Sequence, residues 1–142
     1  MLKYISYVSE QSHSLSENDI EKLLERSRLK NSTKGITGIL IYFEGVFTQF
    51  LEGPEQEIDF LYKQIRIDRR HRNFRELFSG STTERFYADW SMAYKALDQQ
   101  KTQAITGYRT FDKSKFFEPV NSSNEHPGVM LLESFVEGLH FF

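Results

Sequence analysis

Residues 36–52 contain the feature that most constrains the fold: two apolar segments separated by only two residues. Residues 36–43 are rich in β-branched and aromatic side chains, and residues 46–52 continue in the same way. Such composition is typical of strands, and the Glu44-Gly45 pair between them predicts a tight hairpin. The centre of the chain is therefore expected to be antiparallel β structure.

A strand over residues 2–8 precedes this hairpin, and a helix is expected between the two. Ser16 suits the N-cap position, Asp19 follows three residues later, and Leu15 and Ile20 bracket the pair, as in a capping box with a hydrophobic staple. Ile20, Leu23, Leu24 and Ser27 then form one face at helical spacing. The polar segment 30–35 predicts the loop that ends this helix, with Asn31 inside it.

A second helix is expected after the hairpin. Gly53-Pro54 opens it, and Glu55 and Glu57 fall in its first turn, where acidic side chains are favourable. Ile58, Leu61 and Ile65 give its buried face. The helix is expected to end near residues 68–71, so that Arg70 and His71 complete its last turn.

Two further strands are predicted over residues 74–84 and 91–96, which gives the order β-α-β-β-α-β-β. This order predicts an α+β, ferredoxin-like sheet with both helices on one face. We expect residues 1–96 to form this core. Residues 97–142 are expected to be a separate extension whose helices cap the other sheet face, because residues 129–139 carry a helical apolar stripe.

Composition limits the class of protein. The net charge of −2 gives no electrostatic footprint for nucleic acid, and no apolar segment is long enough to span a membrane. No cysteine is present and the four histidines lack ligand spacing, so no metal site is expected. Without a signal-peptide pattern, the expected location is the cytoplasm. The 13 Phe, 7 Tyr and 1 Trp residues suffice to line a pocket for a flat ligand.

Gln49 lies in the middle of an apolar strand, and Tyr7 ends another. A buried amide needs hydrogen-bond partners, and leaving its groups unpaired costs roughly 1–3 kcal/mol each. If both side chains face the helices, the hydroxyl and the amide meet in an apolar slot. The pair would then either stabilise the core alone or contact a ligand.

Taken singly, the other polar candidates have ordinary structural explanations. Asn31 suits a turn, and Arg70 and His71 complement the end of a helix. Trp90 and Met92 alternate on the last strand and suit a core. Asp68, beside these, suits a solvated helix end.

In combination these residues resemble the BLUF family of flavin-binding blue-light sensors, over residues 2–95. The motifs that carry the resemblance are Tyr7, Asn31 with Gly35-Ile36-Thr37-Gly38, residues 47–53, Asp68-Arg69-Arg70-His71 and Trp90-Ser91-Met92.

The resemblance implies non-covalent FAD with its isoalloxazine ring between the two helices. Gln49 would contact the flavin N5/O4 edge and accept a hydrogen bond from Tyr7, and Asn31 would bind the O4/N3 edge. Arg70 and His71 would lie near O2 or the phosphates. Trp90 and Met92 would form the pair whose placement toward or away from the flavin varies. The remaining expected cofactor-binding residues are Leu24, Lys30, Ile65 and Asp68; Lys30 stands where many relatives have Asn or His.

The resemblance also implies photochemistry without net reaction, so no enzyme activity is expected. Light would draw an electron and a proton from Tyr7 through Gln49, and Gln49 would be left rotated or tautomerised in a red-shifted state. The signal would pass to a second copy or a downstream partner through residues 97–142. The alternative is a ferredoxin-like module that binds RNA or a small ligand without photochemistry, or an acylphosphatase-like enzyme, although the acidic net charge disfavours RNA.

Overall fold

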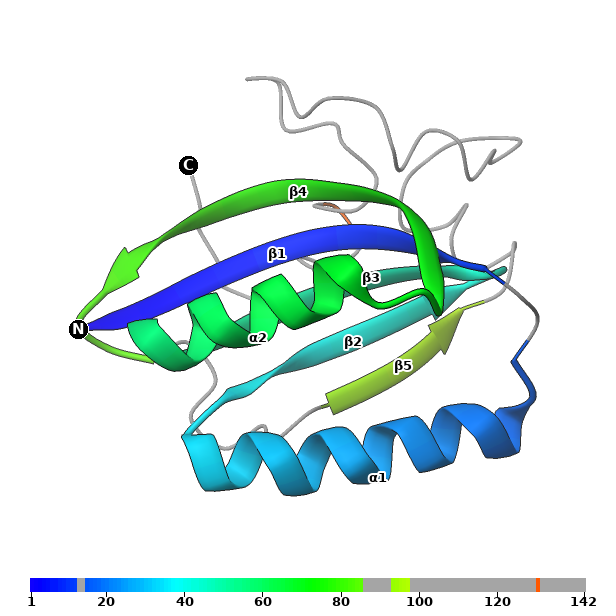
Figure 1. The fold of residues 1–142 in the computed structure, drawn as a ribbon, viewed down its shortest axis with the longest axis horizontal. Helices are drawn as coiled ribbons and strands as arrows, with labels where there is room; N and C mark the ends of the chain where they lie inside the picture. Colours follow the sequence, from blue (N-terminus) through cyan, green and yellow to red (C-terminus); the bar gives the residue numbers. More distant parts are fainter. Residues whose placement is uncertain (13–14, 86–92, 98–129, 131–142) are drawn as a thin grey trace.

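The computed structural model describes residues 1–12, 15–85, 93–97 and 130 of the 142-residue chain. It consists of one sheet with two helices lying on the same face (Figure 1). The helices and strands are, in chain order, β1 (Leu2–Gln11), α1 (Glu17–Lys34), β2 (Thr37–Phe43), β3 (Val46–Pro54), α2 (Glu55–Ile67), β4 (His71–Thr82) and β5 (Ala93–Leu97).

The strands are ordered β4-β1-β3-β2-β5 across the sheet. The first four pair antiparallel, whereas β5 joins the β2 edge in the parallel sense. This arrangement confirms the ferredoxin-like prediction with both helices on one face. It also places β1 and β3 side by side near the centre of the sheet, beneath α2 (Figure 1).

The predicted hairpin between β2 and β3 is confirmed. Glu44 and Gly45 both adopt positive φ angles, of 43° and 83°. Two consecutive residues of this kind form the mirror-image turn whose twist matches that of paired strands. The short turn fixes the register, and Leu40 consequently lies opposite Gln49.

The start of α1 is as predicted, but its end is not. Ser16 and Asp19 cap each other reciprocally. The helix continues to Lys34, where Gly35 in the left-handed conformation donates its N–H to the Asn31 carbonyl. The prediction that residues 30–35 form a loop was wrong: Ser32 and Thr33 bond to carbonyls three residues back and stay helical. Asn31 therefore lies in the last turn of α1.

The predicted end of α2 was also wrong. The helix ends at Ile67, and Asp68 is extended. The Asp68 carboxylate accepts the backbone N–H of Arg70, which forms a local turn of the kind that short polar side chains favour. Arg70 therefore lies in this turn, and His71 is the first residue of β4 rather than the end of the helix.

Both faces of the sheet are buried. On the helical face, a cluster that includes Ile5, Leu51, Ile20 and Ile58 joins β1 and β3 to α1 and α2. On the opposite face, side chains such as Phe50 are also buried. The predicted helices over this second face, and the predicted boundary at residue 96, concern residues that lie almost entirely outside the described part and stay predictions.

Neither α1 nor α2 combines the length and apolarity needed to cross a membrane, and this finding concerns only the residues that the structure describes.

Candidate functional site

Tyr7 and Gln49 meet between the sheet and the helices, as predicted. They are opposite each other in the antiparallel register of β1 and β3, so both side chains leave the sheet on the helical face. The Tyr7 hydroxyl donates a hydrogen bond to Gln49 Oε1. Because that oxygen is occupied by Tyr7, the Gln49 –NH₂ group is oriented away from the hydroxyl.

Tyr7 lies in an aromatic environment that keeps its hydroxyl protonated. Its side chain is 3% exposed and its ring stacks on Phe74 at 4.6 Å between centroids. Burial, and then the neighbouring Tyr62 and Asp68, raise the pKa of Tyr7 far above its ordinary value. The phenol therefore stays protonated at neutral pH, with its proton in the hydrogen bond to Gln49.

A cavity of about 290 Å³ opens beside this pair. Its size is at the lower end of the roughly 300–1,000 Å³ typical of ligand sites. A smaller cavity of about 70 Å³ adjoins it and shares Tyr7, Gln49 and His71. The residues that line the larger cavity come from β1, β3, α1, α2 and the start of β4: Tyr7, Leu23, Ser27, Lys30, Asn31, Gln49, Leu61, Gln64, Ile65, Asp68, Arg70 and His71.

Asn31 supplies the second amide of this cavity. Its position in the last turn of α1 buries it to 5% exposure, and its backbone carbonyl accepts from Gly35 and Ile36. Within the described part of the chain, the structure gives its side-chain amide no hydrogen-bond partner. A buried amide left in this state is costly, so Asn31 indicates that a polar ligand completes the site.

An ion pair lies at the rim of the cavity. Arg70 Nε is 2.9 Å from Asp68 Oδ2, and the Arg70 backbone N–H also bonds to this carboxylate. These hydrogen bonds lower the pKa of Asp68 and raise that of Arg70. Asp68 and Arg70 therefore both stay charged at neutral pH, and their opposite charges balance each other at the rim of the cavity.

His71 lies between α2 and β1 at the same cavity. Its Nε2 is 2.6 Å from the Ile65 carbonyl oxygen, and its Nδ1 is 3.3 Å from Ser9 Oγ. Both ring nitrogens thus have protein partners.

The structure brings most of the predicted site residues together. Lys30, Ile65 and Asp68 line the cavity with the residues described above. Leu24 does not line it, because the helical rotation turns Leu24 into the core and its neighbour Leu23 toward the cavity. Trp90 and Met92 lie outside the described residues.

Sequence reasoning missed several lining residues. Leu23 and Ser27 belonged to the predicted apolar face of α1, and Leu61 to that of α2, so helical periodicity already contained this signal. Gln64 had no comparable signal, because an exposed-looking glutamine in a helix is unremarkable.

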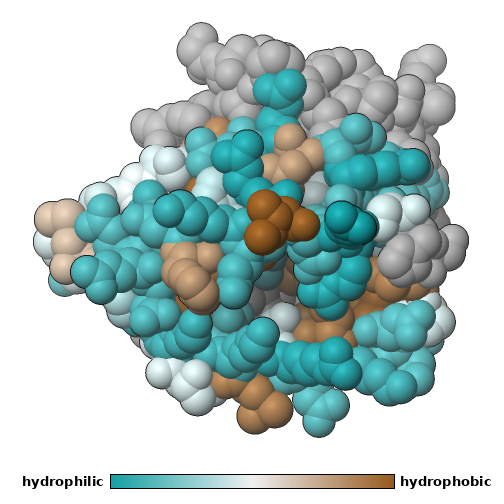
Figure 2. Space-filling model, viewed as in Figure 1, coloured by the Kyte–Doolittle hydropathy of each residue, from teal (hydrophilic) through white to brown (hydrophobic). Residues whose placement is uncertain are grey.

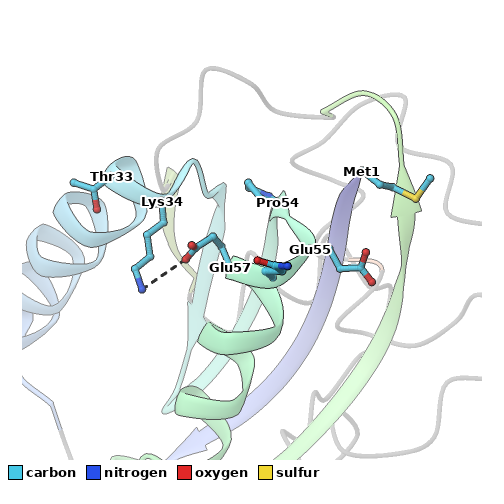
Figure 3. Close-up of a pocket in the computed structure, with 7 residues that line it drawn as sticks. Met1, Thr33, Lys34, Pro54, Glu55 and Glu57 are labelled. Atoms are coloured by element: carbon cyan, nitrogen blue, oxygen red, sulfur yellow. Dashed lines mark ion pairs between the residues drawn. The ribbon is translucent and has the colours of Figure 1, made fainter.

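A second hollow lies between the end of α1 and the start of α2 (Figure 3). It has a volume of about 480 Å³ and is lined by solvent-facing groups. Lys34 and Glu57 form an ion pair of 3.7 Å within it, drawn as the dashed line in Figure 3. The surface on the helical side is otherwise mostly hydrophilic with scattered apolar patches (Figure 2).

Comparison with known proteins gives a consistent result. The model of the family described as BLUF, sensors of blue-light using FAD, matches residues 2–93. Photoactivated adenylate cyclase subunit alpha of Euglena gracilis is 35% identical over 83 residues, which cover 58% of this chain and 8% of that protein. The chain therefore spans less than a tenth of the length of this relative.

Solved structures agree. The dark-state structure of BlrB, a BLUF protein, is 32% identical with a TM-score of 0.64, over 73% of this chain and 77% of that one. The ground state of BlsA has a TM-score of 0.75 over 99% of this chain and 90% of that one, and its 24% identity supports the fold alone. With the family model covering most of the chain and the Tyr7–Gln49 pair at an amide-lined cavity, this chain belongs to the BLUF family of blue-light flavin sensors.

Proposed function

We propose that the cavity between α1 and α2 binds FAD non-covalently, with the isoalloxazine ring beside Gln49. The observation that carries this proposal is the pair of amides, Gln49 and Asn31, at one cavity, with the buried Asn31 amide lacking a partner in the described part of the chain. An amide offers both donors and an acceptor. The flavin pyrimidine edge alternates acceptor, donor and acceptor, so two amides suit it.

The remaining walls fit a flat ring. Leu23, Leu61 and Ile65 give apolar surface on two facing helices, and cofactor sites combine such surface with a few polar groups. Lys30 and the Asp68–Arg70 pair give charge at the rim, where the ribityl and phosphate groups of FAD would need polar contacts.

When bound, the flavin supplies a chromophore that absorbs blue light and becomes an oxidant. Tyr7 would give up an electron to that oxidant, and its hydroxyl proton would move along the existing hydrogen bond to Gln49 Oε1. When the electron and the proton return to Tyr7, Gln49 would be left in a second arrangement, rotated or tautomerised. No net oxidation or reduction would remain.

Gln49 can hold two arrangements because its side chain can satisfy its hydrogen bonds in both. It is only half-buried, and Tyr7 can donate to it or accept from it. A ligand or light can shift such a two-state element only through different interactions in the two states. The changed hydrogen bond from Gln49 to flavin O4 would supply that difference and give the red-shifted signalling state.

We infer that output occurs by binding rather than by catalysis in this chain, through residues 97–142 and a second copy or a downstream protein. The Euglena relatives are named as cyclase subunits and are much longer than the matched segment. The cytoplasm is the compartment predicted from the sequence.

The alternative, an RNA-binding module on the same fold, has less support. Such modules stack bases on exposed aromatic side chains of the sheet. Here Phe47 and Phe50, on the strand that would serve, are 7% and 1% exposed. These two aromatic side chains are therefore not available for base stacking.

The test begins with the absorption spectrum of the purified protein and chromatography of the cofactor it releases. We expect a flavin spectrum, FAD as the released species, and a reversible red shift under blue light. A protein that takes up no added FAD or FMN, and shifts an RNA oligonucleotide in a gel, would overturn the proposal in favour of the binding module. FMN alone on release would correct the cofactor but retain the sensor.

A further inference from the structure

The ring of His71 joins two elements that form opposite sides of the flavin cavity. His71 begins β4, yet its two nitrogens bond to α2 and β1. Nε2 lies 2.6 Å from the carbonyl oxygen of Ile65, in the last turn of α2. Nδ1 lies 3.3 Å from Ser9 Oγ on β1.

The partners determine where the ring protons lie. A carbonyl oxygen can only accept, so Nε2 must carry a hydrogen. In the neutral ring, Nδ1 is then an acceptor and the Ser9 hydroxyl donates to it. The geometry therefore places a hydrogen on Nε2 and commits both nitrogens to protein groups.

The Ile65 carbonyl is an end group of α2. Carbonyls in the last turn of a helix lack the usual backbone partners and need others. This one accepts the Asp68 N–H at 3.2 Å as well as the His71 ring. His71 therefore stabilises the end of α2, and Ile65, whose carbonyl it holds, lines the cavity.

The other side of the bridge leads to Tyr7. Ser9 is two residues after Tyr7 on β1, so the two side chains share a face, and both line the smaller cavity. The His71 ring also meets Phe74 edge-on at 6.0 Å, and Phe74 stacks on Tyr7. A displacement of the His71 ring would consequently change the position of Tyr7 through both Ser9 and Phe74.

We propose that His71 is a positioning residue: through its two ring nitrogens it ties the end of α2 to β1, and so sets the cavity width and the placement of Tyr7 against Gln49. It makes these protein contacts in addition to lining the cavity. The proposal rests on the proposed flavin site for its photochemical consequence, but not for its structural one.

The structural consequence is tested without flavin. In ¹H–¹⁵N spectra of the His71 ring, assigned with the His71→Gln variant, we expect a hydrogen-bonded proton on Nε2. Hydrogen exchange in residues 65–70 should accelerate in His71→Leu by about three- to tenfold, the effect of losing one or two hydrogen bonds, while β2 and β3 exchange as in the wild type. An Nδ1–H pattern or unchanged exchange at the end of α2 would overturn the bridge.

The photochemical consequence is tested in the flavin-loaded protein. In His71→Leu we expect dark recovery to change by about three- to tenfold, since the loss of a hydrogen bond at His71 is transmitted to Tyr7. His71→Gln, which retains a donor and an acceptor, should recover within about twofold. Ser9→Ala removes one of the two hydrogen bonds with little change in side-chain volume. Its change in dark recovery should lie between those of His71→Gln and His71→Leu.

A change in dark recovery as large in His71→Gln as in His71→Leu would show that the two hydrogen bonds of the ring do not set the recovery, and would overturn the positioning role. So would wild-type recovery in both His71→Leu and Ser9→Ala. If the wild type itself shows no light response, the proposed function fails, whereas the flavin-free measurements still decide whether the bridge exists.

Discussion

The two hollows between α1 and α2 contrast in what their polar groups contact. The hollow at Lys34 and Glu57 is the larger, at about 480 Å³ against about 290 Å³, but its charged groups are 39% and 40% exposed and pair with each other. The cavity at Gln49 contains the buried Asn31 amide, which points to a ligand. The two hollows are therefore distinguished by the burial and the hydrogen-bond partners of their polar side chains, and not by their volumes.

The contrast follows from where each hollow lies. The first is formed by the ends of two helices, where charged side chains reach solvent. The second lies over the centre of the sheet, where β1 and β3 place Tyr7 and Gln49 under cover of both helices. In the second, the Tyr7 side chain that donates to Gln49 is buried, and a hydrogen bond is electrostatically stronger inside a protein than in water.

Tyr7→Phe should produce the largest functional loss, because it removes the phenol hydroxyl that donates to Gln49 Oε1. We expect flavin to bind but the light-induced red shift to disappear. The measurement is absorption before and after blue illumination. Tyr62→Phe is the matched control, since Tyr62 lies 6.2 Å from Tyr7 between ring centroids and should leave the shift intact. A full shift in Tyr7→Phe would contradict the mechanism.

Asn31→Leu should change stability and binding in opposite directions. Removing a buried amide that lacks a partner should raise the free energy of unfolding of the flavin-free protein by about 1 kcal/mol. Flavin affinity should fall by about two- to tenfold, because the variant loses one hydrogen bond to the flavin. Urea unfolding and flavin titration measure the two effects.

The control for Asn31 is Asn18→Leu, at an exposed position on the same helix. It should change flavin affinity little. If Asn31→Leu lowers the stability of the flavin-free protein as well as its affinity, then Asn31 is a structural residue, and the contrast between the two hollows loses its main support.

Asp68→Asn should make stability less sensitive to acid. The hydrogen bonds from Arg70 lower the pKa of Asp68 below its ordinary value of 3.8. The stabilisation is therefore fully present above pH 3.8 and is lost as the pH falls through the lowered value. In urea unfolding series, the difference in the free energy of unfolding between the wild type and Asp68→Asn should become smaller below about pH 3.8. Glu25→Gln, on the exposed side of α1, is the control, and a difference that widens in acid would contradict this role.

Glu57→Gln should have the smallest effect. Its partner Lys34 is 3.7 Å away and both are well exposed, so the pair contributes about 0.2–1 kcal/mol at most. We expect unchanged flavin affinity and light response, with a small stability change that salt abolishes. An altered dark recovery would show that the second hollow belongs to the functional site after all.

Sequence reasoning identified the sheet, both helices and most of the cavity, because strand alternation and helical spacing place side chains on faces. It failed at the helix ends. Residues 31–34 are polar, and most are poor helix formers, yet α1 continues to Lys34 and ends at the Gly35 cap. Asp68 ends α2 by a side-chain turn that the periodicity of apolar residues does not predict. These two errors hid the burial of Asn31 and the bridging position of His71. Both helix ends depend on local side-chain and capping hydrogen bonds, which the spacing of apolar residues does not encode.

The difference spectrum between light and dark for Gln49→Ala, beside the exposed control Gln56→Ala, tests the central claim most directly. If Gln49 is the element that light switches, Gln49→Ala loaded with flavin shows no red shift and Gln56→Ala shows the wild-type shift. A wild-type red shift and recovery in Gln49→Ala would contradict the account.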